Sequence, residues 1–192
     1  MSHKILFINA CVRNQSRTLQ LADYLLDRLS GDVIRRDLEK EDLQPLCKDL
    51  LEKREKLLKD QDFSHELFRY AREFAAADEI VIAAPYWDLS FPALLKIYLE
   101  TITISGITFR YEEEIPRGLC HAKRLIYVTT AGGPIFADFG YSYIKTLAET
   151  LYGIKDTTCI KAENLDVEGM HVSALLCRAK EEIATLFPAK DA

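Results

Sequence analysis

A chain of 192 residues is long enough to bury a substantial core, and it predicts a single domain over residues 1–192. Its net charge of −5 argues against a nucleic-acid partner, and no apolar run approaches the roughly 20 residues that a bilayer-spanning helix needs. The 5 cysteines never stand in a Cys-x-x-Cys spacing, which favours free thiols in a reducing, cytoplasmic compartment over disulfides or a zinc site.

Apolar runs predict strands that alternate with helices along the chain. The predicted strands cover residues 4–9, 32–37, 80–84, 124–129 and 157–162. The first predicted helix is capped by Ser16 or Thr18 and ends at Gly31, and the later ones cover residues 64–77, 92–102, 138–151 and 168–187. Alternation of this kind is typical of a parallel sheet with helices on both faces and right-handed crossovers.

Residues 38–60 carry many charges of both signs together with scattered leucines. The pattern favours a solvated, charged helical excursion with one modest apolar stripe. An insertion that acts as a flap or as a dimer contact is the alternative. Pro45 should interrupt the early part of any helix here, because proline lacks a backbone donor and clashes with the preceding turn.

The stretch around residues 80–84 indicates the centre of the sheet. Its unbroken apolar run stops at Pro85, as expected of a strand that is covered on both faces. Pro92 then stands where the next helix begins. That helix is apolar on more than one face, so we expect residues 92–102 to form the interface of a homodimer. Its large apolar residues are Leu94, Leu95, Ile97, Tyr98, Leu99 and Ile102.

Three loops follow the first, third and fourth strands at their carboxyl ends, where ligands bind in open α/β sheets. Residues 10–18 bring hydroxyls, an amide and two arginines to a helix N-terminus, which suits an anion such as a phosphate. Residues 85–89 offer flat aromatic rings, and the paired glycines in residues 130–133 let a flat ligand approach the backbone. Each loop alone also fits an ordinary cap or turn, but the three together predict one ligand site.

Other kinds of site find less support in the sequence. The 4 histidines lie far apart, so no metal site is predicted, and no G-x-S-x-G elbow is present for a nucleophilic serine. Cys11 stands near a helix start, where a thiol can become reactive, but a buried spectator is the favoured interpretation. The glutamates at residues 112–114 are expected to form a solvated turn.

Two motifs give the chain a family resemblance: A-A-P-Y-W-D-L-S-F-P-A-L-L-K at residues 83–96 and S-G-I-T-F-R-Y at residues 105–111. From Lys4 to the C-terminal helix, the chain resembles the FMN-dependent NADH-azoreductase and NAD(P)H:quinone oxidoreductase family. The resemblance implies a flavodoxin-like three-layer sandwich whose five-stranded parallel sheet has the order 2-1-3-4-5. It also implies an enzyme that binds FMN and takes NADH or NADPH as co-substrate.

The resemblance assigns roles to residues of the three loops. It implies that FMN is bound by Ala10, Ser16, Arg17, Thr18, Pro85, Tyr86, Trp87, Asp88, Leu89, Thr130, Ala131, Gly132 and Gly133. Tyr86, Trp87 and Phe136 are the expected walls of the substrate slot, and no side chain is expected to act as a catalytic nucleophile. The family often has a serine where this chain has Ala10 or Cys11. It commonly has an asparagine where this chain has Asp88, and often a polar residue where this chain has Ala131.

The resemblance further implies a ping-pong cycle in which two electrons pass from NAD(P)H through the flavin to a quinone or azo compound. Two alternatives remain open at this point. One is an FMN electron carrier that exchanges single electrons with protein partners, and the other is a flavodoxin-like binding or regulatory protein that has lost the cofactor. Turnover of NADH with a quinone separates the enzyme from the carrier, and FMN binding separates both from the third class.

Overall fold

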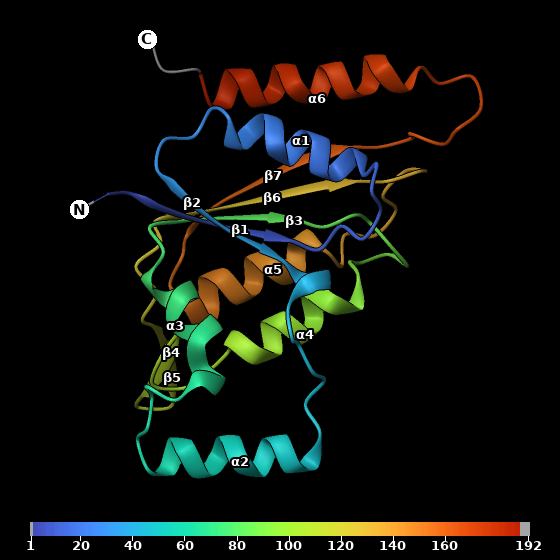
Figure 1. Cartoon of the computed structure of the whole chain (residues 1–192). Coiled ribbons are helices and arrows are strands. Elements are labelled where there is room, and N and C mark those ends of the chain that lie inside the picture. The colour runs from blue at the N-terminus through green and yellow to red at the C-terminus, as the bar shows by residue number, and fades with distance from the viewer. Residues whose placement is uncertain (1, 189–192) are drawn as a thin grey trace.

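Five parallel strands form the central sheet of the computed structural model, which describes residues 2–188. The strands are β1 (Lys4–Asn9), β2 (Asp32–Asp37), β3 (Glu79–Ala83), β6 (Arg124–Thr130) and β7 (Asp156–Ala162). They lie in the order β2-β1-β3-β6-β7 (Figure 1). The predicted five-stranded parallel sheet is therefore confirmed, and each strand lies within one residue of its predicted bounds.

Helices cover both faces of this sheet (Figure 1). One face carries α1 (Arg17–Leu26) and α6 (Val172–Leu186). The other face carries α3 (Arg69–Ala76), α4 (Ala93–Ile102) and α5 (Tyr141–Leu147). Within residues 2–188, no helix combines the length and the apolar composition that crossing a membrane requires.

The strands divide their side chains between two buried cores, because successive residues of a strand point to opposite faces. In β1, Ile5 and Phe7 join the core under α1 and α6, whereas Leu6 and Ile8 join the core under α3, α4 and α5. Every residue of β3 is buried, which explains why its sequence after Glu79 reads as an unbroken apolar run. The central position of β3 places the loop that follows it between the loops of β1 and β6.

Three helices begin later than the sequence predicts. The one expected over residues 138–151 starts at Tyr141 with Gly140 as its N-cap residue, and the side chain of Asp138, which precedes the helix, accepts hydrogen bonds from the N–H groups of Tyr141 and Ser142. It continues as a π-helical segment, η3 (Ala148–Tyr152). The last helix starts at Val172 rather than at residue 168, because Gly169 has a φ of 81° that interrupts a right-handed helix. The helix expected over residues 64–77 is a 3-10 turn, η2 (Glu66–Phe68), followed by α3.

The sequence does not predict the antiparallel hairpin formed by β4 (Phe109–Glu112) and β5 (Ile115–Gly118). Glu113 and Glu114 make its exposed turn with φ values of 49° and 64°, which agrees with the solvated turn expected here. Two-residue turns of this handedness normally carry glycine or asparagine. A pair of glutamates therefore gives no sign that two strands flank the turn.

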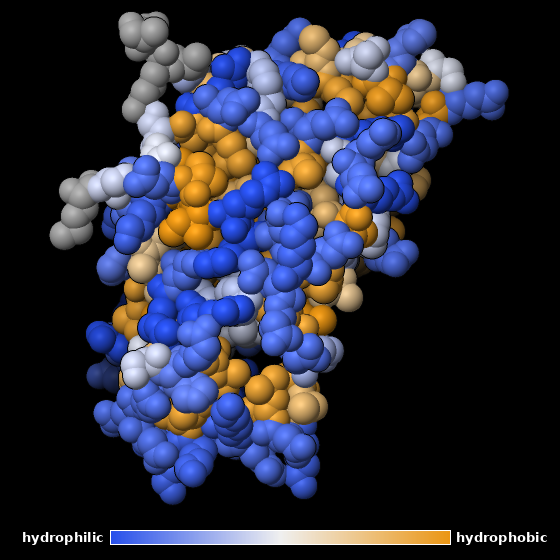
Figure 2. Space-filling model, in the orientation of Figure 1, coloured by the Kyte–Doolittle hydropathy of each residue, from blue (hydrophilic) through white to orange (hydrophobic). Residues whose placement is uncertain are grey.

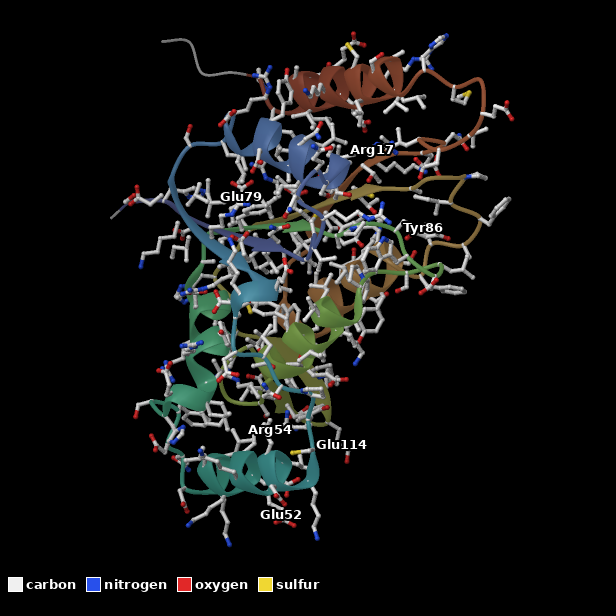
Figure 3. The ribbon with its side chains drawn as sticks, turned by 45° about the vertical axis from the view of Figure 1, so that its right-hand side comes forward. Arg17, Glu52, Arg54, Glu79, Tyr86 and Glu114 are labelled. Carbon is white, nitrogen blue, oxygen red and sulfur yellow. The ribbon has the colours of Figure 1, made fainter. Side chains whose placement is uncertain are left out.

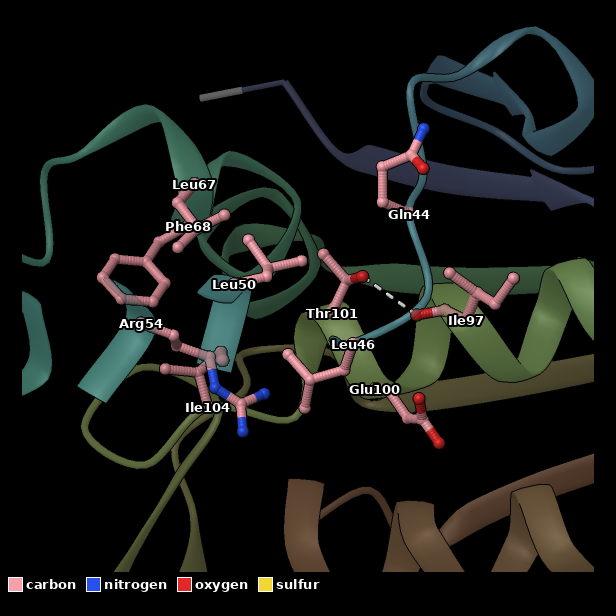
Figure 4. A pocket seen from close by; sticks show the side chains of 10 residues that line it. All are labelled: Gln44, Leu46, Leu50, Arg54, Leu67, Phe68, Ile97, Glu100, Thr101 and Ile104. Carbon is pink, nitrogen blue, oxygen red and sulfur yellow. Dashed lines mark hydrogen bonds between the residues drawn. The ribbon is translucent and has the colours of Figure 1, made fainter. Parts of the chain in front are cut away.

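Residues 38–60 hold a 3-10 turn, η1 (Leu38–Lys40), a non-helical stretch around Pro45, and helix α2 (Lys48–Lys59). No residue of α2 is fully buried, and charged side chains occur along its whole length. Its apolar side faces α4 across a small cavity of about 30 Å³, in which Leu50 lies opposite Ile97 (Figure 4). Apolar side chains gather in the hollow where α2 meets the rest of the protein (Figure 2).

Tyr98 of α4 provides a test of the core. Its side chain is fully buried, and its Oη has no hydrogen-bond partner among residues 2–188. Because an unpaired buried hydroxyl costs roughly 1–3 kcal/mol, we expect Tyr98→Phe to raise the free energy of unfolding in urea by about 1 kcal/mol. Tyr152 is a matched control that is equally buried but bonds to Oγ1 of Thr103 at 2.7 Å. Tyr152→Phe should lower the same free energy by about 1 kcal/mol, and equal effects of the two variants would contradict this interpretation.

Candidate functional site

The loops after β1, β3 and β6 meet at the carboxyl edge of the sheet and enclose a cavity of about 330 Å³. This volume falls within the range of about 300–1,000 Å³ found for small-molecule sites. Figure 3 shows Arg17 and Tyr86 at this end of the sheet and Glu79 at the opposite end. The predicted site residues that line the cavity are Ser16, Arg17, Thr18, Pro85, Tyr86, Trp87, Thr130, Ala131 and Gly132.

The first wall of the cavity is the start of α1. Of the two predicted caps, Ser16 is the N-cap, and its Oγ accepts a hydrogen bond from the N–H of Leu19 at 3.2 Å. Thr18 instead lies inside the helix, and its buried Oγ1 is 2.7 Å from Oγ1 of Thr130. The N–H groups of Arg17 and Thr18 belong to the first turn, where a helix offers them no acceptor. These donors and the positive helix end can together hold an anion.

The second wall is the turn that follows β3. Trp87 and Ser90 exchange two backbone hydrogen bonds, of 3.1 and 2.8 Å, so the chain reverses at Asp88 and Leu89. Both residues at the tip have a positive φ, 50° and 66°, in a left-handed conformation that costs non-glycine residues roughly 1 kcal/mol or more. The ring of Tyr86 is fixed beside this turn, because its hydroxyl donates to the carbonyl of Ala137 at 2.9 Å.

The third wall joins the loop after β6 to the loop after β7. The N–H groups of Asn164, Leu165 and Asp166 donate to the carbonyls of Gly133, Ala131 and Gly132 at 3.1, 3.2 and 2.8 Å. A Cβ atom on Gly132 would lie 2.5 Å from a carboxylate oxygen of Asp166, so only glycine leaves room for this contact. The guanidinium of Arg17 then donates to Asp166 at 2.7 Å and closes the ring of loops.

Some predicted residues lie away from the cavity. Ala10 is only 1% exposed and belongs to the core, whereas Asp88, Leu89 and Gly133 belong to loops that line the cavity but do not line it themselves. Phe136, expected in the substrate slot, is 85% exposed on the loop between β6 and α5. Its contact with a substrate, like the cofactor roles of the other four, stays a prediction.

Two residues outside the predicted site, Leu165 and Asp166, line the cavity from the loop after β7. The predicted fifth strand could have indicated them, because the loop that follows it also leaves the carboxyl edge of the sheet, where ligands bind. Arg13 and Gln15, which also line the cavity, fall inside the predicted loop at residues 10–18.

Cys11 also lines the cavity, but it has the properties of a spectator. Burial raises the pKa of its thiol to about 11, so the reactive thiolate is scarce at neutral pH. Its Sγ lies 3.7 Å from the carbonyl oxygen of Ala83. Within residues 2–188, no group of three or more His, Cys, Asp or Glu side chains could hold a metal ion. The cavity thus combines donors that can bind an anion with aromatic side chains that can flank a flat ring.

The chain is similar in sequence to a known protein family and to named enzymes of known cofactor dependence. A family described by its flavodoxin-like fold matches residues 3–186. An FMN-dependent NADH:quinone oxidoreductase of Clostridium perfringens strain SM101 is 35% identical, with 95% of this chain and 97% of that protein covered. A second enzyme of that name, from Clostridium acetobutylicum, is 36% identical, with 90% and 92% covered.

Solved structures share the fold at lower identity. An azoreductase from Bacillus anthracis strain Sterne has a TM-score of 0.84 at 23% identity, with 96% of this chain and 98% of that chain covered. An FMN-dependent NADH-azoreductase from Bacillus anthracis strain Ames Ancestor, solved in complex with FMN, has a TM-score of 0.82 at 20% identity, with 96% and 97% covered. At these identities, the structures establish a common architecture.

Proposed function

The chain belongs to the flavodoxin-like family that its sequence resembles, and from this premise we propose that it is an FMN-dependent oxidoreductase that passes two electrons from NADH to a quinone. The observation that carries the proposal is the cavity itself. It joins an anion-binding helix start to an aromatic wall, in a chain that matches FMN-dependent NADH:quinone oxidoreductases over most of its length. Azo compounds are a second acceptor class, which the fold shared with azoreductases supports.

The residues present fit each part of FMN. The N–H groups of Arg17 and Thr18 and the Arg17 guanidinium would hold the phosphate. The Ser16 hydroxyl would join them, because its oxygen accepts from Leu19 while its hydrogen remains free to donate. Tyr86, Trp87 and the backbone at Gly132 would flank the ring. When bound, FMN supplies the redox chemistry, and the protein contributes binding, orientation and exclusion of water.

The nicotinamide and the acceptor would use one slot in turn, beside Tyr86, Trp87 and Phe136. The hydrogen bond from Tyr86 to Ala137 supports this arrangement, since it ties the aromatic wall to the loop that carries Phe136. Ping-pong kinetics follow if the two substrates cannot be bound together. Parallel double-reciprocal lines for NADH at several quinone concentrations would support the shared slot, and intersecting lines would reject it.

Absorption spectroscopy of the purified protein is the direct test of the proposed function. We expect FMN to bind, its visible absorbance to fall on addition of NADH, and the absorbance to return with menadione. FMN binding without NADH:menadione turnover would instead indicate an electron carrier. A protein that cannot be loaded with FMN would indicate a binding or regulatory role.

We also infer a homodimer that forms through α4. Leu94 remains half-buried on this helix, and Phe91 packs against the partly exposed Tyr143 with ring centroids 5.8 Å apart. Apolar surface that its own chain leaves uncovered supports an interface. Sedimentation velocity at micromolar concentration should give a dimer that Leu94→Lys shifts toward monomer, and a monomeric wild type would refute the interface.

A reducing compartment such as the cytoplasm is inferred from the thiols, since all of the cysteines are free. Burial raises the pKa of Cys11 to about 11 and the pKa values of Cys120 and Cys159 to about 12, whereas Cys47 and Cys177 are exposed. In a titration with Ellman's reagent at pH 8, we therefore expect Cys47 and Cys177 to react at least about 100-fold faster than the other three. Unfolding in guanidinium should make all of them react fast, and five fast thiols in the native protein would contradict the burial.

A further inference from the structure

Asp166 is an acidic residue on the wall of a cavity that is otherwise suited to an anion. It follows β7, and its carboxylate lies against Gly132 in the neighbouring loop. The backbone hydrogen bonds that join residues 164–166 to residues 131–133 hold it there. These bonds fix the main chain of residue 166 relative to Gly132 and bring its carboxylate to the edge of the cavity.

The carboxylate of Asp166 pairs with one of the two arginines that line the cavity. A terminal guanidinium nitrogen, Nη1 of Arg17, donates both to Oδ1 of Asp166 at 2.7 Å and to the carbonyl of Leu165 at 3.2 Å. The side chains of Arg17 and Asp166 are 37% and 65% exposed, so the pair lies at the mouth of the cavity, in contact with solvent. Arg17 is thus turned toward the loop after β7 by two acceptors of that loop.

A bound phosphate and Asp166 would compete for the same part of the cavity. Both are anions, both would lie near the start of α1, and both are ligands for the same guanidinium. The negative charge of Asp166 would repel the phosphate. Its ion pair with Arg17 would also occupy the guanidinium that could otherwise bind the phosphate. We propose that Asp166 is a built-in competitor of the phosphate: it holds Arg17 and weakens the binding of the phosphate end of the ligand.

This inference rests on the proposed function, in which FMN is the ligand of the cavity. It attributes a weakening of FMN binding to the negative charge of Asp166 alone. Asp166→Asn keeps the size of the side chain and an oxygen that can accept from Arg17, but it removes the negative charge. We expect this variant to bind FMN about 3- to 10-fold more tightly at low ionic strength, because a partly exposed charge acts modestly on a doubly charged phosphate. The gain should shrink at 0.5 M NaCl, where exposed charges are screened.

Titration of the apoprotein with FMN, followed by flavin fluorescence, measures the effect without any turnover. Riboflavin is the ligand control, because it lacks the phosphate, and its affinity should be the same for wild type and Asp166→Asn. Asp156→Asn is the protein control: it changes the net charge equally, but Asp156 is exposed at the amino end of β7, away from the cavity. Unchanged or weaker FMN binding by Asp166→Asn, or an equal gain for riboflavin, would overturn the proposal.

A second ligand separates failure of this proposal from failure of the proposed function. If wild type binds no FMN, the FMN assignment fails, but inorganic phosphate still tests the competition. Thermal unfolding in millimolar phosphate, matched in ionic strength with chloride, should then stabilise Asp166→Asn more than wild type. Equal stabilisation of the two proteins would reject the competition on its own.

Discussion

Replacing Ser16 by alanine together with Thr18 by valine is expected to weaken FMN binding by about 10- to 100-fold. A hydrogen bond to a charged group contributes roughly 1.5–3 kcal/mol, and the variant removes the Ser16 hydroxyl that would donate to the phosphate, together with the Thr18 hydroxyl that is bonded to Thr130 in the cavity wall. Valine preserves the volume of Thr18, which is fully buried and bonded to Thr130. Equilibrium dialysis of the apoprotein against FMN measures the loss directly.

The same double variant also loses the N-cap of α1, so its stability must be followed separately. We expect that loss to cost about 1 kcal/mol in the free energy of unfolding without FMN. Loss of FMN affinity in a variant that still unfolds cooperatively would assign the effect to the phosphate site. FMN affinity that stays within about threefold of wild type would remove Ser16 and Thr18 from that site.

Gly118→Ala should be the most destabilising small substitution in the chain's hairpin, at about 3 kcal/mol or more. Gly118 ends β5, where its backbone crosses that of Tyr152 and Gly153. A Cβ atom there would lie 2.2 Å from the nitrogen of Gly153 and 2.2 Å from the carbonyl carbon of Tyr152. Because both contacts are to backbone, no side-chain rotation relieves them, and the hairpin must separate from the end of η3.

Gly133→Ala is the matched control for that substitution. A Cβ atom on Gly133 would meet nothing within 4 Å, and its φ is not in the left-handed region. Urea denaturation of the apoprotein should therefore give a change below about 0.5 kcal/mol for Gly133→Ala. Similar midpoints for the two variants would show that the hairpin yields more readily than its close contact implies.

The strands could be predicted because their burial leaves a direct trace in composition. β3 is covered on both faces, so its residues after Glu79 are apolar without alternation, and Pro85 stands two residues beyond its end. The first and second strands were likewise found with their observed bounds. The order of strands came from the resemblance, since no pattern within one strand specifies its neighbours.

The features that escaped prediction depend on contacts between segments far apart in sequence. Asp166 becomes part of the cavity only because Gly132 leaves room for it and because Arg17, 149 positions earlier, turns toward it. The hydrogen bond between Tyr86 and Ala137 similarly joins two loops that carry no shared motif. Glu113 and Glu114 adopt a left-handed backbone conformation that glycine or asparagine normally occupies in such turns. The sequence therefore does not predict the hairpin of β4 and β5.

Strand β2 forms one border of the sheet, and its sequence D-V-I-R-R-D carries acidic or basic side chains at four of its six positions. A border strand exposes unpaired backbone groups that could template addition of another chain, and charges are a common protection against such stacking. Arg35 forms salt bridges with Asp23 and Asp37, and Arg36 forms salt bridges with Glu41 and Glu73. The charged side chains of this strand are therefore held by partners within the same chain. Sheet-to-sheet polymerisation is thereby discouraged along this border of the sheet.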